Sequence, residues 1–245
     1  MSGQKDQLIY VSLLRKENNM KIFLFDIDGT LLHSGGAGKE GMVAAFAEVF
    51  GIANGFDGIP MSGKTDPLIL QQGLEKCGLQ ATSAQVAQFK SRYFEFLAQK
   101  IEQELPNKQV YPGVFKLLER LHTHPSVRVG LLTGNWRRGA EIKLRHFGIY
   151  HFFEFGAFGD DAVDRNELLP FALKRCQECL QKGITPGQVV VIGDTPSDIQ
   201  CAQVHGAKVL AVATGKYSVS ELHREGANWV VKNLADVEQI LAWIL

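Results

Sequence analysis

Short apolar runs and stretches with helical spacing alternate along the chain, most regularly after residue 107. Apolar runs of this length are typical of strands that are buried on both faces of a parallel sheet. Strands are expected at residues 22–25, 127–132, 152–158, 189–192, 208–213 and 229–231. Helices are expected between them, at residues 114–121, 139–147, 167–181, 199–204, 219–225 and 237–244. This alternation predicts an α/β fold with a Rossmann-like parallel sheet and helices on both faces.

Residues 36–106 interrupt this alternation because they show helical spacing and no strand pattern. Helices are expected there at residues 42–50, 66–77 and 83–105, the last with Ser83 as its N-cap. We therefore predict an all-helical domain of residues 36–106, inserted into an α/β core made of residues 20–35 and 107–245. Residues 1–19 are expected to be an N-terminal extension or an artefact of the assigned start, since Met20 stands directly before the first strand.

Polar side chains follow three of the predicted strands at the points where the strands end. Asp26 and Asp28 follow the first strand, residues 133–135 (Thr-Gly-Asn) follow a second, and Asp194 and Asp198 follow a third. Ligands of open α/β sheets bind at the carboxyl ends of the strands. These side chains are therefore expected to converge at one edge of the sheet.

Carboxylates gathered in this way would repel one another unless a cation joined them. Ligation by oxygen alone suits Mg²⁺, and no His or Cys occurs in these motifs to favour zinc. A carboxylate held near a metal can act as a nucleophile toward phosphorus. Phosphoryl transfer also needs a cation, which the segment 160–166 before the third strand is expected to supply.

Two glycine motifs resemble nucleotide-binding loops but stand in the wrong context. Gly36, Gly38 and Gly41 match G-x-G-x-x-G, yet the preceding strand ends in two acids that a pyrophosphate would avoid, so we interpret these glycines as a hinge. Residues 58–65 match the P-loop pattern, but a glycine-rich segment rather than a strand precedes them. We interpret Lys64 either as a solvated surface lysine or as a cation that reaches a substrate.

The overall composition excludes several classes of partner. The 26 Lys and Arg residues balance the 26 Asp and Glu residues, so no net charge attracts nucleic acid or an anionic membrane. No apolar run approaches the length of a membrane-spanning helix. The four cysteines form no disulfide or zinc pattern, which favours a reducing, cytoplasmic location. The sequence leaves open whether the protein is a monomer or a homodimer.

The motifs at the strand ends resemble those of the haloacid dehalogenase-like hydrolase superfamily, over about residues 20–245. Asp26-Ile-Asp28-Gly-Thr resembles the first motif, Thr133-Gly134-Asn135 the second, and Gly193-Asp194 with Asp198 the fourth. The resemblance implies that Asp26 is the nucleophile and Asp28 the general acid and base. It implies phosphate binding by residues 133–135. It also implies a Mg²⁺ site made of Asp26, the backbone carbonyl of Asp28, Asp194 and a supporting Asp198.

The third motif departs from the family pattern, in which many members carry a Lys-Pro pair at the start of a helix. This chain has Arg165-Asn166 there, and we assign the cationic role to Arg165, with Lys143 and Lys174 as alternatives. The helical insert resembles the small cap of these enzymes, and Lys64 would lie in the cap loop that faces the phosphate. The second acid, Asp28, argues against the dehalogenase branch.

These observations predict a Mg²⁺-dependent phosphatase that acts on a small phosphorylated metabolite through an aspartyl phosphate, resembling phosphoglycolate phosphatases. A sugar-phosphate mutase would keep both aspartates and would be distinguished by its need for a bisphosphate activator. A non-catalytic phosphate-binding regulator is a further alternative, which the presence of both Asp26 and Asp28 disfavours. A P-loop NTPase would instead bind ATP through Lys64.

Overall fold

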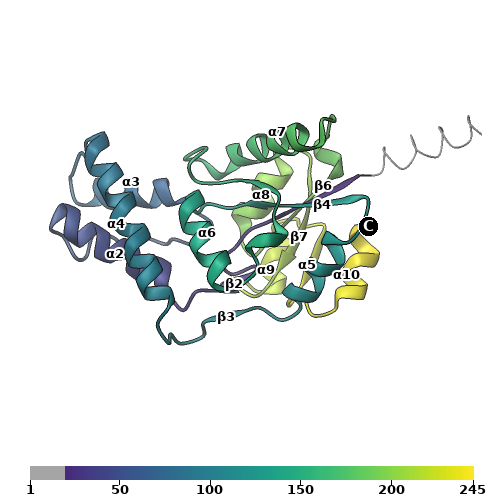
Figure 1. Ribbon diagram of the computed structural model, residues 1–245, viewed down its shortest axis with the longest axis horizontal. Helices are drawn as coiled ribbons and strands as arrows, with labels where there is room; N and C mark the ends of the chain where they lie inside the picture. The colour runs from purple at the N-terminus through teal and green to yellow at the C-terminus, as the bar shows by residue number, and fades with distance from the viewer. Residues whose placement is uncertain (1–19) are drawn as a thin grey trace, which may run out of the picture.

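A computed structural model describes residues 20–245 as a sheet flanked by helices, with a separate group of helices at one end (Figure 1). Within these residues, six parallel strands form one sheet in the order β5-β4-β1-β6-β7-β8. The strands are β1 (Lys21–Phe25), β4 (Val127–Leu132), β5 (Phe155–Ala157), β6 (Val189–Gly193), β7 (Lys208–Val212) and β8 (Trp229–Val231). The predicted Rossmann-like sheet is confirmed, whereas the expected N-terminal extension lies outside the described residues.

The strands are apolar on both sides because helices cover both faces of the sheet. Phe23 and Phe25 of β1 pack into one hydrophobic cluster, and Ile22 and Leu24 pack into another on the opposite face. The first cluster is completed by α5 (Val114–His122), α6 (Arg137–His146) and α10 (Val237–Ile244). The second is completed by α7 (Leu168–Leu180), α8 (Pro196–Gln203) and α9 (Val219–Arg224). Side chains of a strand alternate between faces, so one continuous apolar run stabilises both layers.

The inserted segment forms a helical cap with its own hydrophobic cluster. Its helices are α2 (Ala37–Phe50), α3 (Asp66–Lys76) and α4 (Ser83–Ile101), which lie beyond one end of the sheet (Figure 1). α4 begins after a capping box between Thr82 and Gln85, so Thr82 rather than Ser83 is the N-cap. Within the described residues, no helix is both long and apolar enough to cross a membrane.

Several boundaries differ from those predicted. α2 begins at Ala37 rather than at residue 42, because Gly36 in the left-handed conformation (φ 91°) precedes it. α4 ends at Ile101 rather than at residue 105, before Pro106 restricts the backbone. The expected strand at 152–158 is shorter because a 3₁₀ turn, η1 (Tyr150–Phe152), occupies its start. Two further 3₁₀ turns, η2 (Arg165–Glu167) and η3 (Pro186–Gln188), precede α7 and β6.

A second sheet, which the sequence did not predict, ties together the two segments that join the cap to the core. β2 (Leu32–His33) pairs antiparallel with β3 (Gln109–Val110), and the Tyr111 N–H donates to the Leu31 carbonyl at 3.0 Å. Strands of two residues are too short to give a recognisable pattern. Because both connections are fixed side by side, the cap is held next to the ends of β1 and β4.

Candidate active site

The two acids that follow β1 line one cavity but have different surroundings. The Asp26 N–H donates to the Ile192 carbonyl at 2.9 Å, which continues the pairing of β1 with β6. Ile27 between the two acids packs into the hydrophobic core. Asp26 is buried, whereas 40% of the Asp28 side chain is exposed. Side chains two residues apart on an extended backbone point to the same side. Asp26 and Asp28 therefore stand at the same edge of the sheet, one buried and one accessible.

Three of the predicted acids form a buried cluster, in which oxygens of Asp26, Asp194 and Asp198 lie within 4.8 Å of one another. Burial raises the pKa of Asp26 to about 6, against the opposing effect of Arg165. Burial and the two neighbouring acids hold the pKa of Asp194 well above its usual range. Oxygen donors that repel one another in this way fit a divalent cation such as Mg²⁺. The Asp28 carboxylate lies outside the cluster, so its predicted metal ligation would involve its backbone carbonyl.

Close backbone approach holds Asp194 in place. A Cβ atom on Gly29 or on Gly215 would overlap the Asp194 carboxyl group. The Thr30 hydroxyl donates to Asp194 Oδ1 at 3.1 Å, and the Thr214 hydroxyl donates to the Gly29 carbonyl at 2.5 Å. The loop that follows β7 therefore contributes to the site, although the sequence analysis did not predict it.

Arg165 lies in η2 with its guanidinium buried among the acids. Its Nη2 is 2.5 Å from Asp198 Oδ1 and 3.1 Å from Asp26 Oδ1. Burial alone would lower the pKa of Arg165, but Asp198 and Asp26 raise it above its ordinary value. Lys174, one of the two alternatives for the third motif, is exposed on α7. The structure thus brings Arg165, and not Lys174, to the candidate nucleophile.

The segment Thr133–Asn135 follows β4 directly and faces Asp28. The Asn135 amide donates to Asp28 Oδ2 and to the Thr133 hydroxyl, each at 2.9 Å. A Cβ atom on Gly134 would overlap the backbone of Lys64, because the cap loop passes directly over this glycine. The predicted phosphate-binding segment is therefore positioned next to the candidate acid and base, and its role stays a prediction.

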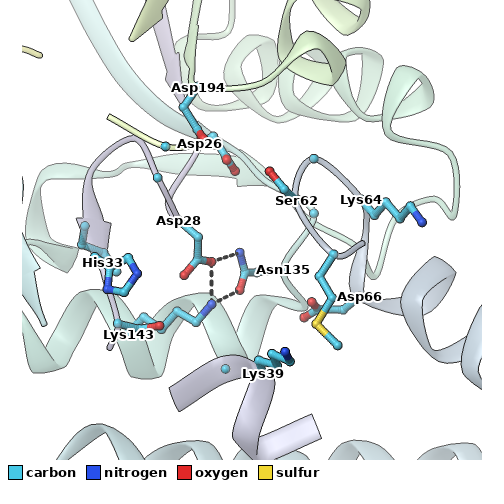
Figure 2. A pocket seen from close by; sticks show the side chains of 18 of the residues that line it. Asp26, Asp28, His33, Lys39, Ser62, Lys64, Asp66, Asn135, Lys143 and Asp194 are labelled. Carbon is cyan, nitrogen blue, oxygen red and sulfur yellow. Dashed lines mark hydrogen bonds and ion pairs between the residues drawn. The ribbon is translucent and has the colours of Figure 1, made fainter. Parts of the chain in front are cut away.

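Lys143 is a second buried cation of the site. This lysine of α6 places its Nζ 2.5 Å from Asp28 Oδ2 and 2.7 Å from Asn135 Oδ1 (Figure 2). The sequence analysis considered it as an alternative to Arg165, whereas the structure brings both to the site, each against a different acid. The spacing of residues in α6 could have indicated this role, because Lys143 shares the buried face of the helix with Ala140 and Leu144. A lysine on the buried face of a helix needs a partner, and here the partner is Asp28.

The cap loop contributes Lys64 to the lining of a cavity of about 500 Å³ that also contains Asp26 and Asp28. The Lys64 ammonium donates to Gln72 Oε1 at 2.6 Å and points away from Asp28 (Figure 2). Thr65, the last residue of the P-loop-like motif, caps α3 and donates to the Val163 carbonyl at 2.6 Å. This motif therefore serves as a helix start at the junction of cap and core.

Asp66, the first residue of α3, also links the cap to the core. Its N–H donates to the Gly134 carbonyl at 2.7 Å, and its Oδ2 accepts the Trp136 N–H at 2.8 Å. Burial raises the pKa of Asp66 to about 7, although Lys143 and the Trp136 N–H oppose the shift. The sequence analysis did not single out this residue.

The raised pKa of Asp66 gives a prediction for stability. The folded protein keeps the Asp66 proton that the unfolded chain loses between pH 3.8 and about 7, so stability falls as pH rises through this window. The contribution has a slope of up to about 1.4 kcal/mol per pH unit. We expect Asp66→Asn to remove this contribution, so the variant gains stability relative to wild type from pH 5 to pH 7. Urea unfolding across this range, with the exposed Asp57→Asn as control, measures the difference, and a constant difference would contradict the prediction.

The site can now be compared with known families. A family model described as haloacid dehalogenase-like hydrolase matches residues 20–206. The chain belongs to this family. The match covers the first, second and fourth motifs, the cap and Arg165. The predicted family and a hydrolytic enzyme are thereby confirmed, while the roles of the individual residues of this haloacid dehalogenase-like hydrolase stay predictions.

Curated relatives of this hydrolase include two enzymes named phosphoglycolate phosphatase. The protein of Rhodospirillum rubrum is 26% identical over 89% of each chain. The protein of Mannheimia succiniciproducens is 23% identical over 91% of this chain and 99% of its own. A crystal structure of a predicted phosphoglycolate phosphatase from Haemophilus somnus aligns with a TM-score of 0.66 and 20% identity, over 91% of this chain and 98% of that one. This structural likeness confirms the fold.

Proposed function

We propose that this hydrolase is a Mg²⁺-dependent phosphatase that cleaves a small phosphorylated metabolite through an aspartyl-phosphate intermediate. The observation that carries the proposal is the pairing of a buried Asp26, 3.1 Å from Arg165, with an accessible Asp28 in the same cavity. A carboxylate nucleophile, a second acid for proton transfer and fixed cations are the components that phosphoryl transfer through a covalent intermediate requires.

The two aspartates would divide the reaction into two steps. An Asp26 oxygen attacks the phosphorus, the bond to the leaving oxygen breaks, and Asp28 gives that oxygen its proton so that an alcohol departs. Asp28, now a carboxylate, then takes a proton from water as the water oxygen attacks the phosphorus of the aspartyl phosphate. This second step releases inorganic phosphate, restores Asp26 and returns the proton to Asp28.

The remaining residues would bind the metal and the phosphoryl group. Asp26, Asp194 and the Asp28 carbonyl, supported by Asp198, would hold Mg²⁺. The bound ion would neutralise negative charge on the transferring group. Arg165 already pairs with Asp26 and would keep this carboxylate in place while it reacts. Thr133, Gly134 and Asn135 would bind phosphate oxygens, and Lys64 would join them by releasing Gln72 Oε1, to which its ammonium donates in the structure.

The size and lining of the cavity limit the substrate. A volume of about 500 Å³, partly closed by the cap, suits a small metabolite rather than a macromolecule. Lys39 and Lys64 of the cap line this cavity. Together with the names of the curated relatives, these cations support a phosphate monoester with a second anionic group, such as a carboxylate.

Phosphate release provides the test. We expect release from p-nitrophenyl phosphate or from a phosphorylated carboxylic acid in the presence of Mg²⁺, and at least about 100-fold slower release with excess EDTA, because the carboxylate cluster then lacks its counter-charge. Restoring Mg²⁺ should restore the rate. Undiminished release in EDTA would contradict the metal-dependent mechanism, and no release across a panel of small phosphate esters would contradict the phosphatase.

The same assay separates the phosphatase from the predicted alternative. A sugar-phosphate mutase would form an isomeric phosphate ester instead of inorganic phosphate and would require a bisphosphate activator. The cytoplasmic location and the choice between a monomer and a homodimer stay predictions from the sequence.

A further inference from the structure

The environment of Asp28 is asymmetric. The Lys143 ammonium and the Asn135 amide donate to the same oxygen, Oδ2, at 2.5 and 2.9 Å. Among the described residues, no group donates a hydrogen bond to the other oxygen, Oδ1. The Asp28 side chain is also 40% exposed, while that of Lys143 is 5% exposed. One oxygen of Asp28 is therefore held from the protein side, and the other is available to the cavity.

Lys143 is itself held from several sides. Its Nζ also donates to Asn135 Oδ1 at 2.7 Å, and the Asn135 amide in turn donates to the buried hydroxyl of Thr133. Ala140 and Leu144, which flank Lys143 on α6, are fully buried in the core of the sheet. The stem and the ammonium of Lys143 are therefore both fixed before Asp28 is bound. The contact with Asp28 then costs little further rotamer entropy, which would otherwise weaken it.

The cap contributes to this arrangement through one of the glycines near the start of α2. A Cβ atom on Gly38 would lie 3.3 Å from Lys143 Nζ, so α2 passes directly over the ammonium group. A Cβ on Gly41 would lie 3.2 Å from the Leu97 backbone nitrogen of α4. These two glycines of the G-x-G-x-x-G pattern therefore permit close packing, and the hinge expected of the pattern stays a prediction.

We propose that Lys143 is a positioning residue that holds Asp28 by Oδ2 and thereby aims Oδ1 at the leaving oxygen of the substrate. This inference rests on the proposed phosphatase function. Arg165 cannot take this role, because its guanidinium is paired with Asp26 and Asp198. The two buried cations thus have separate tasks: Arg165 holds the nucleophile, and Lys143 holds the acid and base.

The leaving group of the substrate provides a readout that a merely structural role would not change. Departure of p-nitrophenolate needs little protonation, whereas phenolate and alkoxide leaving groups need a proton from the acid. Because kcat/KM reports the steps up to departure of the alcohol, it measures the step in which Asp28 gives its proton. Misplacing Asp28 should therefore lower kcat/KM most for the poorest leaving group.

The experiment compares Lys143→Met with wild type on p-nitrophenyl phosphate, phenyl phosphate and an alkyl phosphate that the wild-type enzyme hydrolyses. We expect kcat/KM to fall on the order of 100-fold for the alkyl ester and by less than about tenfold for p-nitrophenyl phosphate. Lys143→Gln, which keeps a neutral donor, is measured in parallel. It should lose kcat/KM most on the alkyl ester and least on p-nitrophenyl phosphate, as Lys143→Met does, but each loss should be smaller. Lys174→Met, which removes an exposed lysine of α7, should leave all three values unchanged.

The outcomes separate this inference from the function on which it rests. Equal losses of kcat/KM on all three esters in the folded variants, or no loss, would overturn the positioning role while leaving the phosphatase intact. If Lys143→Met does not fold, the Lys143→Gln variant decides by the same comparison. If neither folds, Lys143 is a structural residue and the proposal is wrong. Wild-type enzyme that hydrolyses none of the esters would refute the phosphatase, and the inference with it.

Discussion

Asp26→Asn is expected to abolish phosphate release while leaving the protein folded. Asparagine has nearly the same shape as aspartate, but its neutral amide cannot form the acyl phosphate. Loss of a nucleophile typically lowers kcat on the order of 10⁴-fold or more, and the other carboxylate at this strand end, Asp28, already serves as the acid and base of the proposed reaction. Asp28 follows two residues later and is held toward Lys143 and Asn135.

Folding should survive this substitution because the cluster contains more acid than one arginine can balance. Asp26, Asp194 and Asp198 are all buried, and burial raises the pKa of Asp26 to about 6, so removing one charge relieves repulsion. The measurement is steady-state phosphate release at saturating Mg²⁺, with thermal unfolding of the same samples.

A matched control is Asp57→Asn, which makes the same substitution at an exposed aspartate of the cap. It should retain wild-type turnover. Mass spectrometry of acid-quenched wild type should detect phosphate on the peptide that contains Asp26, and the variant should lack it. Turnover of Asp26→Asn within about tenfold of wild type would show that another residue is the nucleophile.

Arg165→Met is expected to cause the largest loss of stability among the substitutions considered, together with loss of activity. Arg165 Nη2 is the cation closest to both Asp26 and Asp198, at 3.1 and 2.5 Å, and 6% of the arginine side chain is exposed. Removing one partner from a buried ion pair leaves the other charges uncompensated, at a cost of about 3–5 kcal/mol. Bound Mg²⁺ would offset part of this cost, so the loss should be larger in EDTA.

Urea unfolding of Arg165→Met and wild type, with and without Mg²⁺, measures this cost. Arg120→Met is the control, because Arg120 also pairs with an acid, Glu238, but 49% and 62% of the two side chains are exposed. An exposed pair contributes about 0–1 kcal/mol, so the control should unfold close to wild type. If Arg165→Met and Arg120→Met lost equal stability, Arg165 would not be the counter-charge of the carboxylate cluster.

Several features of this protein could be predicted from the sequence because they depend on neighbouring residues in the chain. Apolar runs such as residues 22–25 predicted strands buried on both faces, and acids placed directly after those runs could lie nowhere but at the carboxyl edge of the sheet. For the same reason Asp26, Asp194 and Asp198 could be expected to meet, and they form one cluster. The break in alternation at residues 36–106 likewise predicted the helical cap.

The tertiary structure decided the features that depend on how distant segments pack. The pairing of β2 with β3, the approach of Gly215 to Asp194 and the contact of Asp66 with Trp136 join segments without any local pattern. Lys64 matched a phosphate-binding motif, yet its ammonium group donates to Gln72. The sequence alone could not distinguish the tasks of Arg165 and Lys143. A side chain's partner depends on the position of its whole element, and α6 carries Lys143 to Asp28 while η2 carries Arg165 to Asp26.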